Sequence, residues 1–287
     1  MARRRRIRRW LTGGLLLALV GGGIFTAYQV MQRSDAVITE SCTAKVGSES
    51  YSLALDQTAN ASLISAIAVR RSLPARAASI ALATSLQESK LRNIDYGDTA
   101  GPDSRGLFQQ RPSQGWGTEA QVMDPVYATN AFYDVLIKVE GYESLPITEA
   151  AQKVQRSAFP DAYADHEPEG RAFASALTGQ SGAGLDCVLR PADANDGPGA
   201  VSTEMDAAFG AQDGTVNGAT LSVPAAGAQG WAVANWAVAN AKSLGITRVC
   251  FGGQAWDRHA RNGWQAADSS QSAVQISTYA PTVSSTP

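Results

Sequence analysis

The stretch PARAASIALATSLQESKLRN, residues 74–93, decides the fold of the region around it. Small and apolar side chains recur at helical spacing, and the proline suits a first turn, so the stretch predicts a helix. Ala77, Ala81, Thr84 and Glu88 share one face at steps of four, three and four residues. The sequence therefore places a carboxylate on a mostly apolar face, at the C-terminal end of the helix.

A carboxylate at Glu88 has two interpretations. Partial burial and the negative end of the helix dipole both disfavour the charged form, so we expect a raised pKa for Glu88. A carboxyl group that stays protonated near neutral pH suits general-acid cleavage of a glycosidic bond. The alternative is a last-turn glutamate whose side chain simply turns to solvent.

Helical patterns dominate the residues on either side of this stretch. Residues 62–73 and 168–178 have apolar side chains at helical spacing. Asp124 and Pro125 suit the N-cap and first position of another helix. One short hairpin is possible near residues 44–54. We therefore expect a mainly α domain within a chain that is α+β overall.

Changes in composition divide the chain into five expected regions. These are a basic N-terminus with a transmembrane helix (1–33), the mainly α domain (40–188), a linker rich in Gly, Pro and Asp (189–222), a small tryptophan-rich α+β module (223–266) and a disordered tail (267–287).

The N-terminal residues combine positive charge with a long uncharged segment. Six arginines lie in residues 1–9, and residues 10–32 carry no charge. A helix of roughly 20 apolar residues crosses a bilayer, and positive charge marks the cytoplasmic side. We expect a single-pass membrane anchor with the N-terminus in the cytoplasm and the body outside. A cleaved signal peptide or a twin-arginine signal, the two alternatives, would also export the body.

The rest of the chain is acidic. The whole chain has a net charge of −2; without the six N-terminal arginines, 18 basic residues remain against 26 acidic ones, a net charge of −8. Surfaces that bind nucleic acid are basic, so we exclude nucleic acid as a partner of the folded part.

Three cysteines fit an extracytoplasmic compartment. Cys42 and Cys187 bracket the mainly α region, so we expect a disulfide that joins its ends, worth roughly 5 kcal/mol in the chain-entropy model. Two separate buried thiols are the alternative. Cys250, in the apolar run ITRVCF, is expected to be a buried strand residue.

A long loop rich in turn residues follows the helix that opens this section. It reads NIDYGDTAGPDSRGLFQQRPSQGWG, residues 93–117. Such loops inside compact domains are usually binding or catalytic elements. The amides of Gln109 and Gln110 can bind sugar hydroxyl and acetamido groups, and the rings of Tyr96 or Trp116 can stack on a sugar face.

Three motifs occur in the order found in a known superfamily. Glu88 and Ser89 end a helix, SRGLFQ follows at residues 104–109, and DPVYATNAF then begins a helix with Asn130 on its inner face. Over residues 58–180 the chain resembles the lysozyme-like superfamily of lytic transglycosylases and goose-type lysozymes. The string GLFQQRPSQGWGT is similar to a version common in exported actinobacterial proteins.

The resemblance implies a membrane-anchored enzyme that cleaves the glycan strands of peptidoglycan. Glu88 would be the general acid and base on the bond between N-acetylmuramic acid and N-acetylglucosamine. Where the family has Ala-Tyr-Asn-Ala-Gly, this chain has VQRSAFPDAY instead, and the resemblance then assigns the cleft positions of this segment to Gln155, Ser157 and Tyr163. The implied substrate-binding residues are Ser89, Gln109, Gln110, Asn130, Tyr163, Tyr96 and Trp116.

A second carboxylate would change the product. Without one, the 6-hydroxyl of the muramyl residue closes on C1, and the enzyme is a lytic transglycosylase. A carboxylate about 6.5–9.5 Å away that activates water would give inverting hydrolysis, as in a muramidase. Asp95, Asp98 and Asp103 are the candidates, but loop aspartates more often serve turns and caps. The transglycosylase is therefore the favoured interpretation.

Other features leave further alternatives open. His166 and His259 lie in different regions without ligand spacing, so we expect no metal and no cofactor. The tryptophans of the C-terminal module suit either a small core or a glycan-stacking surface. Beside an enzyme, the chain suits a non-catalytic cell-wall-associated binding module, or an exported interaction or conjugation-type protein whose wall cutting is local. The sequence identifies no protein partner.

Overall fold

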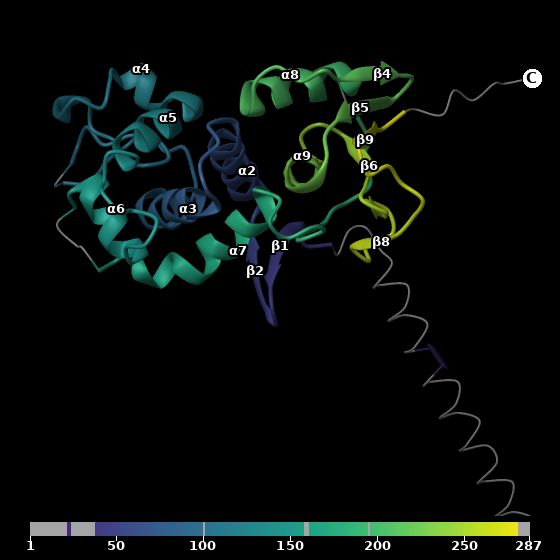
Figure 1. Ribbon diagram of the computed structural model, residues 1–287, viewed down its shortest axis with the longest axis horizontal. Helices are drawn as coiled ribbons and strands as arrows, with labels where there is room; N and C mark the ends of the chain where they lie inside the picture. Colours follow the sequence, from purple (N-terminus) through teal and green to yellow (C-terminus); the bar gives the residue numbers. More distant parts are fainter. Residues whose placement is uncertain (1–21, 24–37, 100, 158–160, 195, 281–287) are drawn as a thin grey trace, which may run out of the picture. The chain divides into compact units, whose positions relative to one another are not determined.

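The structure is a computed structural model that describes residues 22–23, 38–99, 101–157, 161–194 and 196–280 (Figure 1). Contacts between residues divide the chain into two compact units, Met1–Thr39 and Glu40–Pro287. No helix among the described residues is both long enough and apolar enough to cross a bilayer. The expected anchor within residues 1–33 falls outside them, apart from Gly22 and Gly23.

The first part of the larger unit is helical, as its periodicity predicted. Its helices are α2 (Leu55–Arg70), α3 (Ala75–Ser89), α4 (Glu119–Val122), α5 (Pro125–Leu136), α6 (Ile147–Gln155) and α7 (Glu167–Leu177), with 3₁₀ turns η2 (Pro112–Gln114) and η3 (Ala164–His166). Asp124 caps α5 as expected, because its carboxylate accepts hydrogen bonds from the backbone N–H groups of Val126 and Tyr127.

Helix α3 is the central helix of this part, and it is buried on most of its surface. Its alanines and serines leave little side-chain bulk, so α7 packs closely against it. Gly170 of α7 permits a close approach, since a Cβ there would lie 3.0 Å from the backbone nitrogen of Ala83 and 3.1 Å from the carbonyl oxygen of Ser79. The alanine-rich composition of α3 thus follows from its central position.

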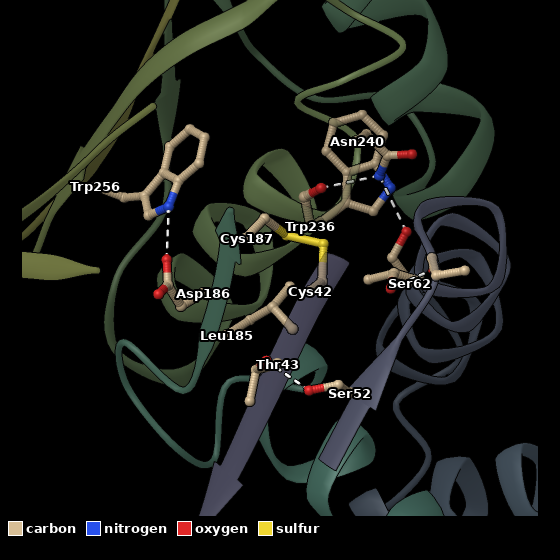
Figure 2. Close-up of a disulfide and its surroundings, with 12 residues drawn as sticks. Cys42, Thr43, Ser52, Ser62, Leu185, Asp186, Cys187, Trp236, Asn240 and Trp256 are labelled. Carbon is tan, nitrogen blue, oxygen red and sulfur yellow. Dashed lines mark hydrogen bonds between the residues drawn. A yellow bond between two sulfur atoms is a disulfide. The ribbon is translucent and has the colours of Figure 1, made fainter. Parts of the chain in front are cut away.

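A small antiparallel sheet joins the two ends of the helical part. It has the order β2-β1-β3, formed by β1 (Ser41–Val46), β2 (Glu49–Leu53) and β3 (Leu185–Val188). The predicted hairpin is confirmed as β1 and β2. Cys42 and Cys187 lie directly opposite each other in the register and form the predicted disulfide (Figure 2).

A six-stranded antiparallel sheet forms the C-terminal part, so the chain is α+β overall. Its order is β4-β5-β9-β6-β7-β8, formed by β4 (Thr215–Asn217), β5 (Thr220–Pro224), β9 (Ala273–Thr278), β6 (Ile246–Phe251), β7 (Gln254–Asp257) and β8 (Trp264–Ala266). Helix α8 (Gly197–Phe209) precedes the sheet, and helix α9 (Gly227–Ala239) connects β5 to β6.

Two segments that the sequence assigned to linker and tail are ordered elements. Residues 197–209 form α8, which buries Val201, Met205 and Ala208 at steps of four and three residues. Glycine, proline and alanine dominate the composition there and masked this short apolar stripe. Strand β9, expected within the disordered tail, is an inner strand of the sheet. Its Val274 and Ile276 are fully buried, as alternation in a strand requires.

The C-terminal elements share a core with the helical part, so they are not a module of residues 223–266 separated by a linker. Helix α9 packs against α2, α7 and the sheet. The buried guanidinium group of Arg258 donates hydrogen bonds to the carbonyl oxygens of Arg190, Ala241 and Ile246. These contacts make the sheet part of the same compact unit.

The four C-terminal tryptophans have packing roles. Trp236 and Trp256 are buried, and Trp256 donates a hydrogen bond to Asp186 at 3.0 Å. The half-buried Trp231 and Trp264 meet edge to face, with ring centroids 5.4 Å apart. This arrangement favours the core interpretation over a glycan-stacking surface. Cys250 lies on β6 as expected, although it is only half-buried.

Candidate active site

Glu88 occupies the last turn of α3, on the face that the sequence predicted. Ala77, Ala81 and Thr84 of that face are fully buried, while the Glu88 side chain is only partly so. Burial is the strongest influence on this carboxyl group and raises the pKa of Glu88. Hydrogen bonds from Tyr163 and Gln155 act in the opposite direction, and the negative charge of Asp98 raises the pKa again.

Tyr163 is the direct partner of Glu88. Its hydroxyl group donates a hydrogen bond to Glu88 Oε1 at 2.7 Å, and its side chain is 1% exposed. Burial, followed by the charge of Glu88, raises the pKa of Tyr163, so the hydroxyl group remains a donor at any physiological pH. The resemblance implied that this tyrosine, in the segment FPDAY, lines the cleft. In the structure its hydroxyl group contacts Glu88.

Gln155, the last residue of α6, connects this pair to the loop. Its Nε2 donates a hydrogen bond to the carbonyl oxygen of Phe108 at 2.8 Å. The same amide lowers the pKa of Glu88 by hydrogen bonding. Three separate segments therefore meet at one carboxyl group: the end of α3, the end of α6 and the residue before η3.

The motif Gly106-Leu107-Phe108 is fastened to α3 by serine side chains. Ser85 Oγ and Ser89 Oγ both donate hydrogen bonds to the carbonyl oxygen of Leu107, at 2.9 and 2.8 Å. Ser89 is buried. Its hydroxyl group thus holds the loop against the helix, a structural role in place of the expected contact with substrate.

The two loop glutamines differ in what they can reach. Gln110 is 1% exposed and donates to the carbonyl oxygen of Ala128 at 3.0 Å, so it packs inside the protein. Gln109 is half-buried and adopts a left-handed backbone conformation, and within the described part of the chain its side chain makes only a long hydrogen bond of 3.3 Å to the Gly106 carbonyl oxygen. Of the two amides, Gln109 is the one available to a ligand.

Among the described residues, no hydrogen bond joins Asn130 to Glu88, Tyr163 or Gln155. Its Oδ1 accepts a hydrogen bond from Arg71 at 3.0 Å, and its Nδ2 donates to the Val126 carbonyl oxygen at 2.9 Å. The amide therefore links α5 to the end of α2. The aromatic candidates also differ from each other: Tyr96 is 65% exposed, whereas Trp116 packs partly against the core.

The three loop aspartates separate clearly. Hydrogen bonds from Ser113, and then the guanidinium group of Arg111, hold the pKa of Asp103 well below its usual range, so Asp103 is a structural anion. Asp95 is exposed. Asp98 accepts a hydrogen bond from the backbone of Gly101, and its charge reaches Glu88. Asp98 is therefore the candidate second carboxylate with electrostatic access to Glu88.

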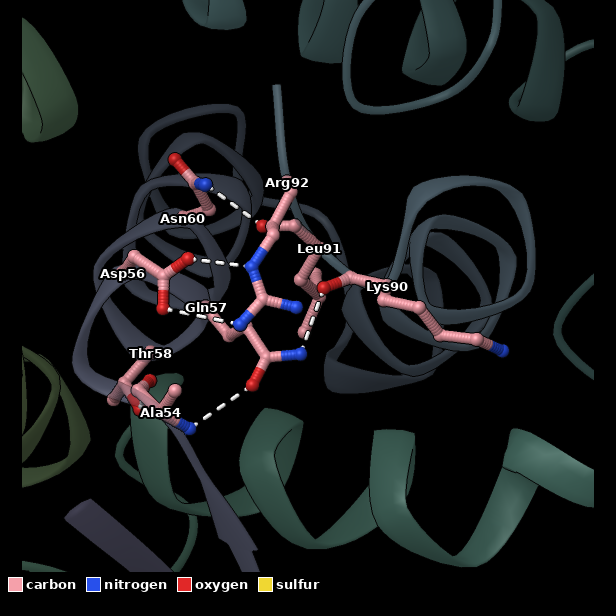
Figure 3. A network of polar contacts seen from close by, with 8 residues as sticks. All are labelled: Ala54, Asp56, Gln57, Thr58, Asn60, Lys90, Leu91 and Arg92. Atoms are coloured by element: carbon pink, nitrogen blue, oxygen red, sulfur yellow. Dashed lines mark hydrogen bonds and ion pairs between the residues drawn. The ribbon is translucent and has the colours of Figure 1, made fainter. Parts of the chain in front are cut away.

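Gln57 and Asn60, which hold the end of α3 in place, were not identified from the sequence. Lys90 and Leu91 directly follow Ser89, and both have left-handed backbone conformations, with φ of 55° and 56°. Gln57 of α2 donates to the Lys90 carbonyl oxygen at 2.9 Å, and Asn60 donates to that of Leu91 at 2.7 Å (Figure 3).

Residues with a Cβ rarely adopt left-handed backbone conformations, so the turn formed by Lys90 and Leu91 is strained. The two hydrogen bonds stabilise this turn at the end of α3. An ion pair between Asp56 and Arg92, 2.7 Å long, closes the same network. The sequence does show three polar residues, Asp56, Gln57 and Asn60, close together at the start of the otherwise apolar helix α2. Their spacing alone does not reveal which residues they bind.

The comparisons with known proteins concern a different part of the chain. A family model described as VldE, C-terminal domain, matches residues 210–276. This segment covers α9 and nearly the whole six-stranded sheet, and it includes none of the residues around Glu88. No curated protein matches the chain.

Proposed function

We propose that the protein cleaves the glycan strands of peptidoglycan as a lytic transglycosylase, with Glu88 as its general acid and base. The observation that carries the proposal is the hydrogen bond of 2.7 Å between Tyr163 and a partly buried Glu88 whose pKa is raised. A carboxyl group that keeps its proton near neutral pH can donate it to a leaving oxygen.

The proposed reaction uses this one carboxyl group twice. Glu88 donates its proton to the bridging oxygen while the bond from C1 of the N-acetylmuramyl residue to that oxygen breaks. The carboxylate then takes the proton of the muramyl 6-hydroxyl group, whose oxygen forms the new bond to C1. The product is a 1,6-anhydro sugar, and Glu88 regains its proton. Tyr163 stabilises the carboxylate in between by donating its hydrogen bond.

The order of sequence motifs supports the same function. Glu88 and Ser89 at a helix end, the Gly-Leu-Phe-Gln loop and a capped helix after it resemble the lysozyme-like superfamily. The contacts of Ser85 and Ser89 with Leu107 give the first two motifs a common physical purpose, because they hold the loop beside the carboxyl group. The match at residues 210–276 lies elsewhere and is neutral on this point.

Location outside the cytoplasm is part of the proposal. The disulfide between Cys42 and Cys187 suits an oxidising compartment. Six arginines before an uncharged segment support a membrane anchor with the body outside. An anchored enzyme of this orientation would face the peptidoglycan.

A hydrolase that uses Asp98 as its base is the second candidate. The observation in its favour is the charge of Asp98, which raises the pKa of Glu88. In that case water would attack C1, and Asp98 would take its proton. The bond from the Gly101 backbone to Asp98 also fits a simple turn, so the transglycosylase remains the preferred proposal.

Mass spectrometry of digested peptidoglycan tests the proposal. Purified peptidoglycan is incubated with the full chain in detergent micelles, beside Glu88→Gln and Asp98→Asn. We expect anhydromuropeptides from the parent and from Asp98→Asn, and none from Glu88→Gln. Reducing-end products that disappear in Asp98→Asn would replace the transglycosylase by the hydrolase. A folded parent without products would favour the non-catalytic wall module.

A further inference from the structure

A pocket of about 490 Å³ lies where the C-terminal elements meet the helical part. Its lining comes from the ends of α2, α7 and α8 and from the starts of α3 and α9. Glu88 is not among the lining residues, so the pocket is separate from the candidate active site. Pockets of this size hold small organic ligands.

The pocket carries positive charge without a balancing carboxylate. Arg70, in the last turn of α2, is the one ionisable side chain among the described residues that line it. No ion pair or hydrogen bond joins the Arg70 side chain to another described residue. Neighbouring arginines differ, since Arg71 pairs with Asp134 and Arg76 with Glu167. The fork of donors on Arg70 is thus available to an anion.

The remaining lining combines free polar groups with an apolar wall. The side chains of Ser72, Gln180 and Gln229 make no hydrogen bond to the rest of the described chain. Leu73 and Phe209 supply apolar surface. A ligand that suits this lining has one carboxylate, amide groups that can both donate and accept, and small apolar side chains. A short peptide with a free C-terminal carboxylate has all three, whereas a phosphate group would want more than one cation.

The walls of the pocket are fastened together, which makes it preformed. Gly179, after α7, lies so close to α9 that a Cβ there would overlap the Ala228 carbonyl group. Asn235 of α9 donates a hydrogen bond to the Ala176 carbonyl oxygen at 2.8 Å, and Asn240 donates to Ser62 of α2 at 3.0 Å (Figure 2). A preformed site loses less conformational entropy when its ligand binds.

We propose that this pocket binds the carboxylate-ended peptide stem of peptidoglycan, an assignment of ligand that rests on the proposed function. Arg70 pairs with the terminal carboxylate, Gln180 and Gln229 bind the peptide amides, and Leu73 and Phe209 contact alanine methyl groups. The segment 210–276, which supplies Gln212, Ala228 and Gln229 to the lining, then has a defined role: it completes a peptide site beside a glycan-cutting domain.

Isothermal titration calorimetry on the full chain in detergent micelles tests this site. The probe is diacetyl-L-lysyl-D-alanyl-D-alanine, compared with its C-terminal amide and its all-L counterpart. We expect the free carboxylate form to bind, the amide form to bind at least tenfold more weakly, and the all-L form to bind more weakly than the D-form.

Two substitutions and a control complete the design. Arg70→Gln removes the cation, and Gln229→Glu adds a carboxylate at an exposed position, so each should weaken binding at least tenfold. Lys138→Gln removes an exposed positive charge outside the lining and should leave binding unchanged. Thermal unfolding of each variant checks that the fold is retained.

The outcomes that overturn the inference are distinct. The proposed peptide site is refuted if the parent does not bind the probe, or if Arg70→Gln binds it as tightly as Lys138→Gln does. If the all-L peptide binds as tightly as the D-alanyl-D-alanine probe, the pocket binds protein C-termini, and the peptide stem is refuted as its ligand. A parent that releases muropeptides yet binds no probe contradicts this inference alone, and one that binds the probe without cutting contradicts the proposed function alone.

Discussion

Glu88 combines three influences that work against one another. Burial raises the pKa of its carboxyl group, hydrogen bonds from Tyr163 and Gln155 lower it, and the charge of Asp98 raises it. The net effect is a raised pKa, which favours the acid form that the proposed reaction needs at its start. The same hydrogen bonds favour the carboxylate that the reaction needs halfway through.

Replacement of Tyr163 by phenylalanine tests this balance. The loss of the hydroxyl donor removes an interaction that lowers the pKa, so the pKa of Glu88 should rise further. Carboxyl ¹³C NMR of glutamate-labelled protein measures it, with Glu88→Gln to assign the signal. Tyr96→Phe is the matched control, because Tyr96 is 65% exposed. An unchanged or lower pKa in Tyr163→Phe would refute the role of this bond.

Glu88→Gln should make the protein more stable at neutral pH. Because the folded-state pKa lies above the unfolded value, the folded state holds more protons between the two values, and stability falls as the pH rises through that window. The substitution removes this loss, so we expect Glu88→Gln to be more stable than the parent at pH 7 and equally stable at pH 3, where both forms of the site are neutral. Urea unfolding at both pH values measures it. A loss of stability at pH 7 would contradict the expected pKa shift.

At the scale of elements, the end of α3 depends on α2. Asn60 and Gln57 hold the carbonyl groups of two successive residues with left-handed backbones. Asn60→Leu keeps the approximate shape of the side chain and removes the donor. We expect it to lower the free energy of unfolding by about 1 kcal/mol, and hydrogen exchange to speed up at the end of α3.

Gln114→Leu is the control for Asn60→Leu. Gln114 is exposed, and its side chain makes no hydrogen bond to another described residue. Equal losses of stability in the two variants, or no faster exchange in Asn60→Leu, would show that α2 does not hold this turn.

The elements also show what the sequence could predict. The buried face of α3, the hairpin β1–β2 and the cap at Asp124 were all predictable, because periodicity and local chemistry determine them. Helix α8 was not, because its apolar stripe is short and its composition resembles a linker.

At the candidate site, the sequence mainly failed to predict contacts between residues that are far apart in the chain. Tyr163 lies 75 residues after Glu88, so only a resemblance connected them before the structure did. Asn130 was placed on the correct helix, but its partner, Arg71, lies at the end of α2, and helical spacing does not reveal such a partner. Burial of Gln110 likewise depends on the path of the loop.

At the scale of the whole molecule, a disulfide and a shared core hold residues 40–280 together as one unit. The bridge from Cys42 to Cys187 spans 145 residues, and the chain-entropy model gives it about 5 kcal/mol. Replacement of both cysteines by alanine should lower stability by about 2–5 kcal/mol in urea unfolding. Cys250→Ala is the control and should change stability little, since Cys250 is half-buried. Equal losses would contradict the structural role of the bridge.

The central claim is that Glu88 cleaves peptidoglycan. The most direct measurement is the initial rate at which the full chain releases soluble muropeptides from purified peptidoglycan, compared with Glu88→Gln. We predict a loss of at least about a hundredfold, because a general acid contributes that much or more. The parent rate should also fall as the pH rises above the raised pKa of Glu88. A Glu88→Gln variant as fast as its parent, or a folded parent that releases nothing, would contradict the claim.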